Sequence, residues 1–150
     1  MTSRILFVCL GNICRSPSAE GIMRHLSQGQ SLTLDSAGTS NWHEGEPPCP
    51  QMVRAAARRG YDISALRARQ MSRTDFGRFD LIIGMDGENI ADIEALRPAG
   101  SGVPVRLFTD YAPETGMDHV PDAYYTRDYD GALDLIEACA AGLMRDLTRT

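Results

Sequence analysis

The chain has 150 residues, 43% of them hydrophobic, and a net charge of −5 at neutral pH. This length suits one domain with its own hydrophobic core, and the negative charge argues against a nucleic-acid partner. No apolar run approaches the roughly 20 residues of a membrane-spanning helix, and the first apolar run is too short for a signal peptide, so we expect a cytoplasmic protein without a membrane span.

The first elements surround a short loop that carries a cysteine and an arginine. The apolar residues 5–8 predict a buried strand, which stops at Cys9. A loop then runs to Arg15, and Ser16 and Pro17 predict the start of a helix over residues 17–26. Serine is favoured at the N-cap, and proline is favoured at the first helical position because its missing N–H has no partner there.

The rest of the chain alternates between strands and helices. Periodicity and breakers predict strands at residues 32–37, 81–85 and 105–108, and helices at 50–59, 72–79, 89–96 and 130–147. Residues 64–70 show little periodicity, and residues 109–127 are predicted to be a long polar loop. This alternation indicates a single α/β domain over residues 1–150, with a parallel sheet and helices on both faces. Ligands of such sheets bind at the carboxyl ends of the strands, where Cys9 lies.

The loop after the first strand has the composition of an anion site. Free backbone N–H groups and the positive end of a helix attract phosphate, and they also favour the thiolate form of a cysteine. Arg15 offers a planar fork of donors, Gly11 leaves the backbone uncovered, and Asn12 tolerates a left-handed turn. Ser16 could hydrogen-bond the thiolate of Cys9. We interpret Cys9 as a nucleophile aimed at phosphate; the alternative is a small buried residue at a strand end.

The cysteines and histidines do not indicate a disulfide scaffold or a metal centre. The four cysteines are scattered, and the chain has neither a CxxC pair nor an HExxH motif. We therefore predict no structural disulfide framework, no metal site and no cofactor.

The sequence around this loop resembles a known family. The stretch VCLGNICRSPSAEG resembles the active-site loop of the low-molecular-weight protein tyrosine phosphatases, and SAGTSNWHEGEPPCP, RARQMSRTDF, FDLIIGMD and VPDAYY extend the resemblance over nearly the whole chain. The resemblance implies a four-stranded parallel sheet of order 2-1-3-4. It also implies metal-free hydrolysis of phosphotyrosine through a phosphocysteine intermediate.

Catalytic roles follow from the resemblance, residue by residue. Cys9 is the nucleophile, Arg15 clamps the phosphate, and Asp122 is the general acid that later activates water. The backbone N–H groups that bind the phosphate belong to Leu10, Gly11, Asn12, Ile13, Cys14 and Arg15. Without the resemblance, Asp122 would be interpreted as a solvated loop aspartate.

The resemblance also implies a substrate rim and a redox residue. Trp42, Tyr124 and Tyr125 flank the cleft and stack on an aromatic substrate, the alternative being packing on the core. Cys14 matches a family cysteine that forms a disulfide with the nucleophile, and its alternative is plain packing. Cys49 and Cys139 are predicted to be structural.

Two positions depart from the family pattern. The family usually has proline after the general acid, where this chain has Ala123, and we expect a more mobile loop. Many relatives brace the loop asparagine with a histidine where this chain has Leu66, so the brace for Asn12 must come from elsewhere. Ser36 is the candidate.

Three other functions compete with phosphotyrosine hydrolysis. A thioredoxin-coupled arsenate reductase needs two further cysteines beyond the third strand, where only Cys139 is present. A protein arginine phosphatase has threonine where this chain has Ile13. A non-catalytic phosphopeptide-binding module would have no need to keep Cys9, Arg15 and Asp122 together. The expected partner is a phosphotyrosine protein, with a bacterial tyrosine kinase as one candidate, and the expected state is a monomer or weak dimer.

Overall fold

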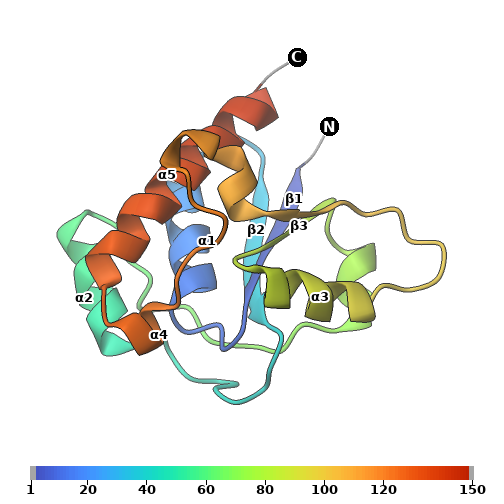
Figure 1. The fold of residues 1–150 in the computed structure, drawn as a ribbon, viewed down its shortest axis with the longest axis horizontal. Coiled ribbons are helices and arrows are strands. Elements are labelled where there is room, and N and C mark those ends of the chain that lie inside the picture. Colours follow the sequence, from blue (N-terminus) through green and yellow to red (C-terminus); the bar gives the residue numbers. More distant parts are fainter. Residues whose placement is uncertain (1–2, 149–150) are drawn as a thin grey trace.

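Four parallel strands form the sheet at the centre of this computed structural model, which describes residues 3–148. The strands are β1 (Arg4–Cys9), β2 (Thr33–Gly38), β3 (Leu81–Gly84) and β4 (Val105–Leu107). Their order is β2-β1-β3-β4, and β1 pairs in parallel with both β2 and β3. The fold class and the strand order predicted from the sequence are confirmed. In Figure 1 the chain enters β1 from the N-terminus at the top, and the loops after β1 and β2 gather at the bottom.

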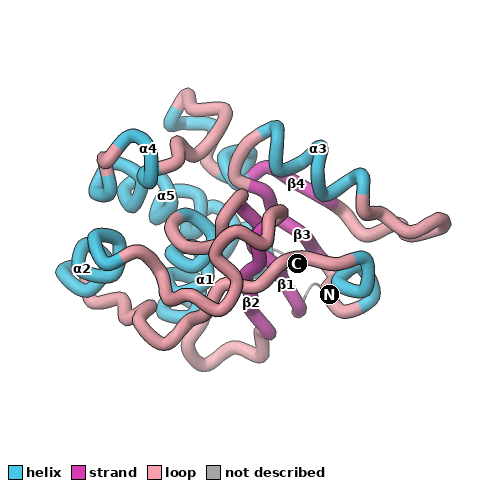
Figure 2. The backbone as a smooth tube through the Cα atoms, turned by 90° about the horizontal axis from the view of Figure 1, so that it is seen from below, coloured by secondary structure: helices cyan, strands magenta, loops and turns pink. Residues whose placement is uncertain are grey.

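Helices cover the sheet on both faces. They are α1 (Arg15–Leu26), α2 (Pro50–Arg58), α3 (Gly87–Ala95), α4 (Ala123–Thr126) and α5 (Tyr129–Thr148). Short 3₁₀ turns are η1 (Arg73–Gly77), η2 (Phe108–Tyr111) and η3 (Pro113–Thr115). Figure 2 shows α1, α2, α4 and α5 on one side of the sheet and α3 on the other.

The strand β1 is buried on both faces, which explains its unbroken apolar run. Alternate side chains of β1 enter two different cores, as the two-residue period of a strand requires. Ile5, Phe7 and Cys9 belong to the core shared with α1 and α5, whereas Leu6 and Val8 belong to the smaller core beneath η1 and α3. Cys9 therefore faces α1, the helix that follows the loop.

The start of α1 differs from the sequence prediction because the side chain expected to cap this helix has other partners. The helix α1 begins at Arg15 after Cys14, so the prediction of Ser16 as its N-cap is wrong. The Ser16 hydroxyl lies inside the first turn and contacts the Cys9 sulfur and the Asn12 amide instead. A left-handed residue at Asn12, with φ of 57°, brings the backbone into the helix early.

The predicted long loop over residues 109–127 contains η3, α4 and most of η2. The predicted strand at 105–108 ends one residue early because Phe108 turns into η2. Its ring packs on Phe7 with 5.4 Å between centroids. An added side chain at Gly142 in α5 would collide with the Tyr111 carbonyl, so η2 and α5 are in close backbone contact. Burial of Phe108 thus ties this segment to the core.

The segment over residues 64–70, whose periodicity was weak, contains neither a helix nor a strand but adds a bridge beside β2. Gln70 pairs in parallel with Gly38 at the end of that strand. The helix predicted at 89–96 begins at Gly87, where the Asp86 carboxylate caps it by accepting from the Asn89 N–H at 2.8 Å. Across residues 3–148, we find no helix long and apolar enough to cross a membrane.

Candidate active site

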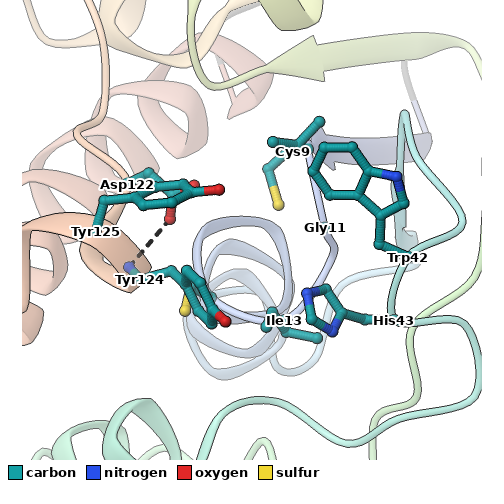
Figure 3. Close-up of a pocket in the computed structure, with 10 residues that line it drawn as sticks. Cys9, Gly11, Ile13, Trp42, His43, Asp122, Tyr124 and Tyr125 are labelled. Carbon is teal, nitrogen blue, oxygen red and sulfur yellow. Dashed lines mark hydrogen bonds between the residues drawn. The ribbon is translucent and has the colours of Figure 1, made fainter.

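The Cys9 sulfur lies at the carboxyl end of β1, at the base of a pocket between two loops. The residue is 3% exposed, and its Sγ lies 3.0 Å from the Ser16 hydroxyl and 3.3 Å from the Asn12 backbone N–H. Both groups can donate a hydrogen bond to a thiolate, which is the form that such donors stabilise. In Figure 3 the sulfur points into the opening between Asp122 and Tyr125 on one side and Trp42 on the other.

Asn12 holds the loop in shape through a buried polar network. Its Nδ2 donates to the hydroxyls of Ser16, at 2.8 Å, and Ser36, at 3.0 Å. Its Oδ1 accepts from the Arg69 backbone N–H at 3.0 Å, and Ser36 donates onward to the Glu20 carboxylate at 2.7 Å. These contacts brace Asn12 from α1, from β2 and from the segment around Arg69.

The Glu20 carboxyl group at the far end of this network is buried. Burial raises the pKa of Glu20 above its ordinary value, although hydrogen bonds from Arg24 and Ser36 favour its charged form. Arg24 reaches the carboxylate at 2.7 Å and also donates to the Leu34 carbonyl of β2. The network therefore joins α1 to β2 directly behind the loop.

The Arg15 guanidinium is enclosed by acidic partners at the other end of the loop. The residue is 2% exposed, and its Nη1 donates to the Asp86 carboxylate at 2.7 Å and to the Val120 carbonyl at 3.0 Å. Its Nη2 lies 3.4 Å from the Asp122 carboxylate. Burial opposes the charge, but the Cys9 sulfur, Asp86 and Asp122 raise the pKa of Arg15 above its ordinary value. The cation is therefore permanent.

One donor of this guanidinium has no protein partner. The Nε of Arg15 is buried and makes no hydrogen bond within residues 3–148. An unpaired buried N–H on a charged group is costly, and a bound anion would satisfy it. Arg15 is thus held at both terminal nitrogens, and its Nε remains a free donor.

Asp122 reaches the pocket from the N-terminus of α4. Its Oδ1 accepts from the Tyr124 backbone N–H at 3.1 Å, a contact drawn in Figure 3, while its Oδ2 faces Arg15. The side chain is 22% exposed, so water can reach it. Ala123 is completely buried and forms the first position of α4.

Aromatic side chains form the rim of the pocket. Trp42 is 66% exposed, Tyr124 is 44% exposed and Tyr125 is 67% exposed, and all three line the same pocket as Cys9. Tyr124 stacks edge-on against Tyr125 at 5.2 Å and packs beside His43 at 6.0 Å between centroids. Figure 3 shows Trp42 and His43 facing the two tyrosines across the opening. The alternative of packing on the core is therefore not observed for Trp42 or Tyr125.

The sequence of the chain matches an established protein family. A family model described as low molecular weight phosphotyrosine protein phosphatase matches residues 4–150. The chain belongs to this family. The resemblance stated from the sequence is therefore confirmed, and with it the assignment to a group of hydrolases.

Named relatives match this phosphatase over nearly their whole length. YfkJ of Bacillus subtilis, a low molecular weight protein-tyrosine-phosphatase, is 36% identical, and the match covers 97% of this chain and 96% of YfkJ. A Synechocystis protein that carries the family's name is 42% identical over 96% of each chain. The crystal structure of YfkJ has a TM-score of 0.91 and covers 98% of this chain and 95% of that one. A Drosophila arginine phosphatase has a TM-score of 0.89 at 26% identity, over 99% of each chain.

Sequence reasoning missed three residues at the site of this phosphatase. Asp86 holds Arg15, His43 packs on Tyr124 at the rim, and the Arg69 backbone holds Asn12. A signal for Asp86 was present, because it comes two residues after the end of β3 and so lies at the same edge of the sheet as Cys9. His43 and Arg69 gave no such signal, since loop packing alone brings them to the site.

The cysteines other than Cys9 differ in burial and in partners. Cys139 is completely buried in α5, and burial raises the pKa of its thiol to about 12, as expected for an inert packing residue. Cys49 is only half-buried, and its sulfur lies 2.9 Å from that of Cys14. The sulfur that contacts the Cys14 sulfur is therefore that of Cys49.

Proposed function

We propose that this phosphatase hydrolyses phosphotyrosine in proteins through a phosphocysteine intermediate at Cys9. The observation that carries the proposal is that three groups gather at the carboxyl end of β1. Cys9 brings a sulfur with two donors, Arg15 brings a buried cation with a free Nε, and Asp122 brings a water-accessible carboxyl group. This set suits transfer of a phosphoryl group to sulfur and then to water.

In the first step the Cys9 thiolate attacks phosphorus. The S–P bond forms as the bond from phosphorus to the phenol oxygen breaks, and Asp122 donates its proton to the leaving phenolate. The loop N–H groups of residues 10–15 and the Arg15 guanidinium stabilise the charge on the equatorial oxygens. Asp86 and the Val120 carbonyl hold Nη1 and thereby orient the fork before substrate binds.

In the second step water attacks the phosphocysteine. The Asp122 carboxylate takes a proton from the water, the new P–O bond forms, and the S–P bond breaks. The Ser16 hydroxyl and the Asn12 N–H stabilise the departing thiolate of Cys9. Asp122 leaves this cycle protonated and ready for the next substrate.

The rim supports an aromatic phosphoester as the substrate. Ile13 and Trp42 give the pocket apolar walls, and Tyr124 and Tyr125 present ring faces at the opening. A phenyl ring spans the distance between a recessed phosphate and this rim, whereas phosphoserine has no ring to contact it. A phosphotyrosine protein is therefore the preferred partner, and a bacterial tyrosine kinase remains one candidate.

The competing functions find less support. The similarity to an arginine phosphatase keeps phosphoarginine as the second candidate, but the apolar Ile13 offers a guanidinium no hydrogen bond. A thioredoxin-coupled reductase needs accessible cysteines after β3, and Cys139 is completely buried. A non-catalytic binding module has no use for a proton donor such as Asp122 beside Arg15.

The deciding experiment measures hydrolysis of p-nitrophenyl phosphate with EDTA present. Cys9→Ser should lose at least about 10⁴-fold in kcat, because a hydroxyl cannot replace the thiolate. Cys139→Ser is the matched control, since it changes a cysteine that lies outside the pocket. Activity in Cys9→Ser, or loss of activity with EDTA, would overturn the mechanism.

Two further measurements test the proton donor and the substrate. Asp122→Ala should slow phosphotyrosine hydrolysis by about 10²–10⁴-fold, and p-nitrophenyl phosphate far less, because p-nitrophenolate leaves without a proton. Asp118→Ala, an exposed change in the same segment, is the control. When phosphotyrosine and phosphoarginine peptides are compared at equal concentration, the enzyme should hydrolyse the phosphotyrosine peptide faster. Faster hydrolysis of the phosphoarginine peptide would identify a protein arginine phosphatase instead.

A further inference from the structure

The sulfurs of Cys14 and Cys49 lie 2.9 Å apart, although the residues are 35 positions apart in the chain. Cys14 is the N-cap residue of α1, and Cys49 is the N-cap residue of α2. The Cys49 backbone N–H donates to the Ile13 carbonyl at 3.0 Å, so the two backbones are also joined next to the sulfurs. A disulfide between them would need a sulfur movement of about 1 Å.

The two sulfurs differ in access. Cys14 is 2% exposed, whereas Cys49 is half-buried and lines a second pocket with Glu46, Gln51 and Tyr129. The phosphate pocket contains Cys9 and Cys14 but not Cys49. A small oxidant can therefore reach Cys49 from the second pocket while the first is filled.

The Cys9 sulfur has other partners in the same structure. Its contacts are the Ser16 hydroxyl and the Asn12 N–H, both within the loop. Cys14 contacts Cys49 by its sulfur, and its carbonyl accepts from the Ser18 hydroxyl at 2.7 Å. The arrangement thus pairs Cys14 with Cys49 and leaves Cys9 to the phosphate.

We propose that Cys14 and Cys49 form an intramolecular disulfide when the enzyme meets a hydroperoxide, and that this bond, rather than one to Cys9, is the oxidised form of Cys14. The inference goes beyond the proposed function, because the sulfur contact exists whatever the substrate is. It assigns Cys49 as an oxidation site.

Both steps of this reaction balance. The Cys49 thiolate attacks one peroxide oxygen, the O–O bond breaks, and hydroxide leaves and takes up a proton as water, which yields the Cys49 sulfenic acid. Cys14 then attacks the Cys49 sulfur, the S–O bond breaks, and the leaving hydroxide takes the Cys14 proton to form a second water. Two thiols lose two electrons and two protons, and the peroxide is reduced to water.

The protonation states match these roles. The hydrogen bond from Cys14 lowers the pKa of Cys49 to about 7, and the same contact together with burial raises the pKa of Cys14. Cys49 is therefore the sulfur that carries the negative charge near neutral pH and meets the oxidant first. Cys14 keeps its proton until hydroxide leaves the sulfenic acid.

Tryptic peptides distinguish the possible bonds in the full-length protein. Trypsin cuts after Arg4, Arg15, Arg24 and Arg54, so residues 5–15 contain both Cys9 and Cys14, and residues 25–54 contain Cys49. The reduced enzyme receives one equivalent of hydrogen peroxide, with and without saturating inorganic phosphate. Free thiols are then blocked with iodoacetamide before digestion.

The main product should be a cross-link between peptides 5–15 and 25–54, and fragmentation should assign it to Cys14. Phosphate should not reduce its yield, since the second pocket stays open. Two of the four thiols should be lost, and dithiothreitol should restore them. An internal disulfide in peptide 5–15, a cross-link at Cys9, or a Cys49 thiol that is still alkylated would each overturn the proposal.

Matched variants separate this inference from the proposed function. Cys49→Ser should abolish the cross-link while kcat for p-nitrophenyl phosphate stays at the wild-type value, and Cys139→Ser should keep both. A cross-link between the two peptides in Cys49→Ser would contradict the assignment. The peptide map of the wild type needs no enzymatic activity, so it decides the question even if the proposed chemistry fails.

Discussion

The floor and the rim of the pocket are built in opposite ways. At the floor, Cys9, Asn12 and Arg15 are each at most 3% exposed, and protein partners hold their polar atoms except the Arg15 Nε. At the rim, Trp42 and Tyr125 are about two-thirds exposed, and Tyr125 stacks edge-on against Tyr124. A buried, braced floor preorganises charge, whereas an exposed rim can adapt to the protein that carries the phosphate. Substitutions at the floor and at the rim should therefore affect different properties of the enzyme.

Among substitutions that keep Cys9 and Asp122, the largest effect should follow from Arg15→Lys at the floor. Lysine keeps the charge but cannot bond Asp86 and a phosphate together, so kcat should fall by about 10³-fold. Steady-state kinetics with p-nitrophenyl phosphate measures this loss, with Arg58→Lys, on the exposed face of α2, as the control. A loss in kcat below about tenfold would mean that a positive charge at this position is enough for catalysis without the fork of donors.

A smaller effect is expected for Asn12→Ala, which keeps the catalytic groups and removes their brace. The change strands the Arg69 N–H and puts alanine at a φ of 57°, so the free energy of unfolding should fall by about 2 kcal/mol. The melting temperature and kcat should fall together, because the same bonds hold the loop for both. Asn41→Ala, at an exposed loop position, is the control. An unchanged melting temperature would show that the network does not stabilise the loop.

At the rim, Trp42→Ala should affect only large substrates. The kcat/KM for a phosphotyrosine peptide should fall by up to about tenfold, because stacking of this kind contributes roughly 0.5–1.5 kcal/mol. The kcat for p-nitrophenyl phosphate and the melting temperature should stay unchanged, since the side chain is 66% exposed. Met117→Ala is an exposed apolar control. Equal losses in activity toward both substrates would mean that Trp42 supports the catalytic groups at the floor.

The smallest effect lies beside this pocket, at Cys49, and concerns pH. Only the thiolate of Cys49 reacts with iodoacetamide, so its rate should rise with pH and reach half its maximum near pH 7, where the Cys14 hydrogen bond places its pKa. Cys14→Ala removes that donor and should move the midpoint upward. Mass spectrometry of peptide 25–54 follows the reaction. A wild-type midpoint near the ordinary thiol value of about 8.5 would remove the proposed stabilisation.

Local patterns predicted most of the fold. The unbroken apolar run of β1 and the alternation of strands and helices indicate a parallel sheet, and both are confirmed. The N-cap of α1 was mispredicted because Ser16 has a nearby sulfur and amide to bond, which no local rule includes. The turns of residues 109–127 were missed because they depend on burial of Phe108 against Phe7 rather than on a repeating pattern.

The candidate site likewise contains residues that local patterns could predict and residues that they could not. The loop of residues 9–15 could be predicted from local sequence, since its strand, glycine, arginine and helix start are contiguous and act through the backbone between them. No local pattern indicates that Asp86 holds Arg15, that Asp122 faces it, or that Cys49 contacts Cys14. Those pairs come from segments 35 to 107 positions apart, and only the packing of helices and loops on the sheet brings them into contact.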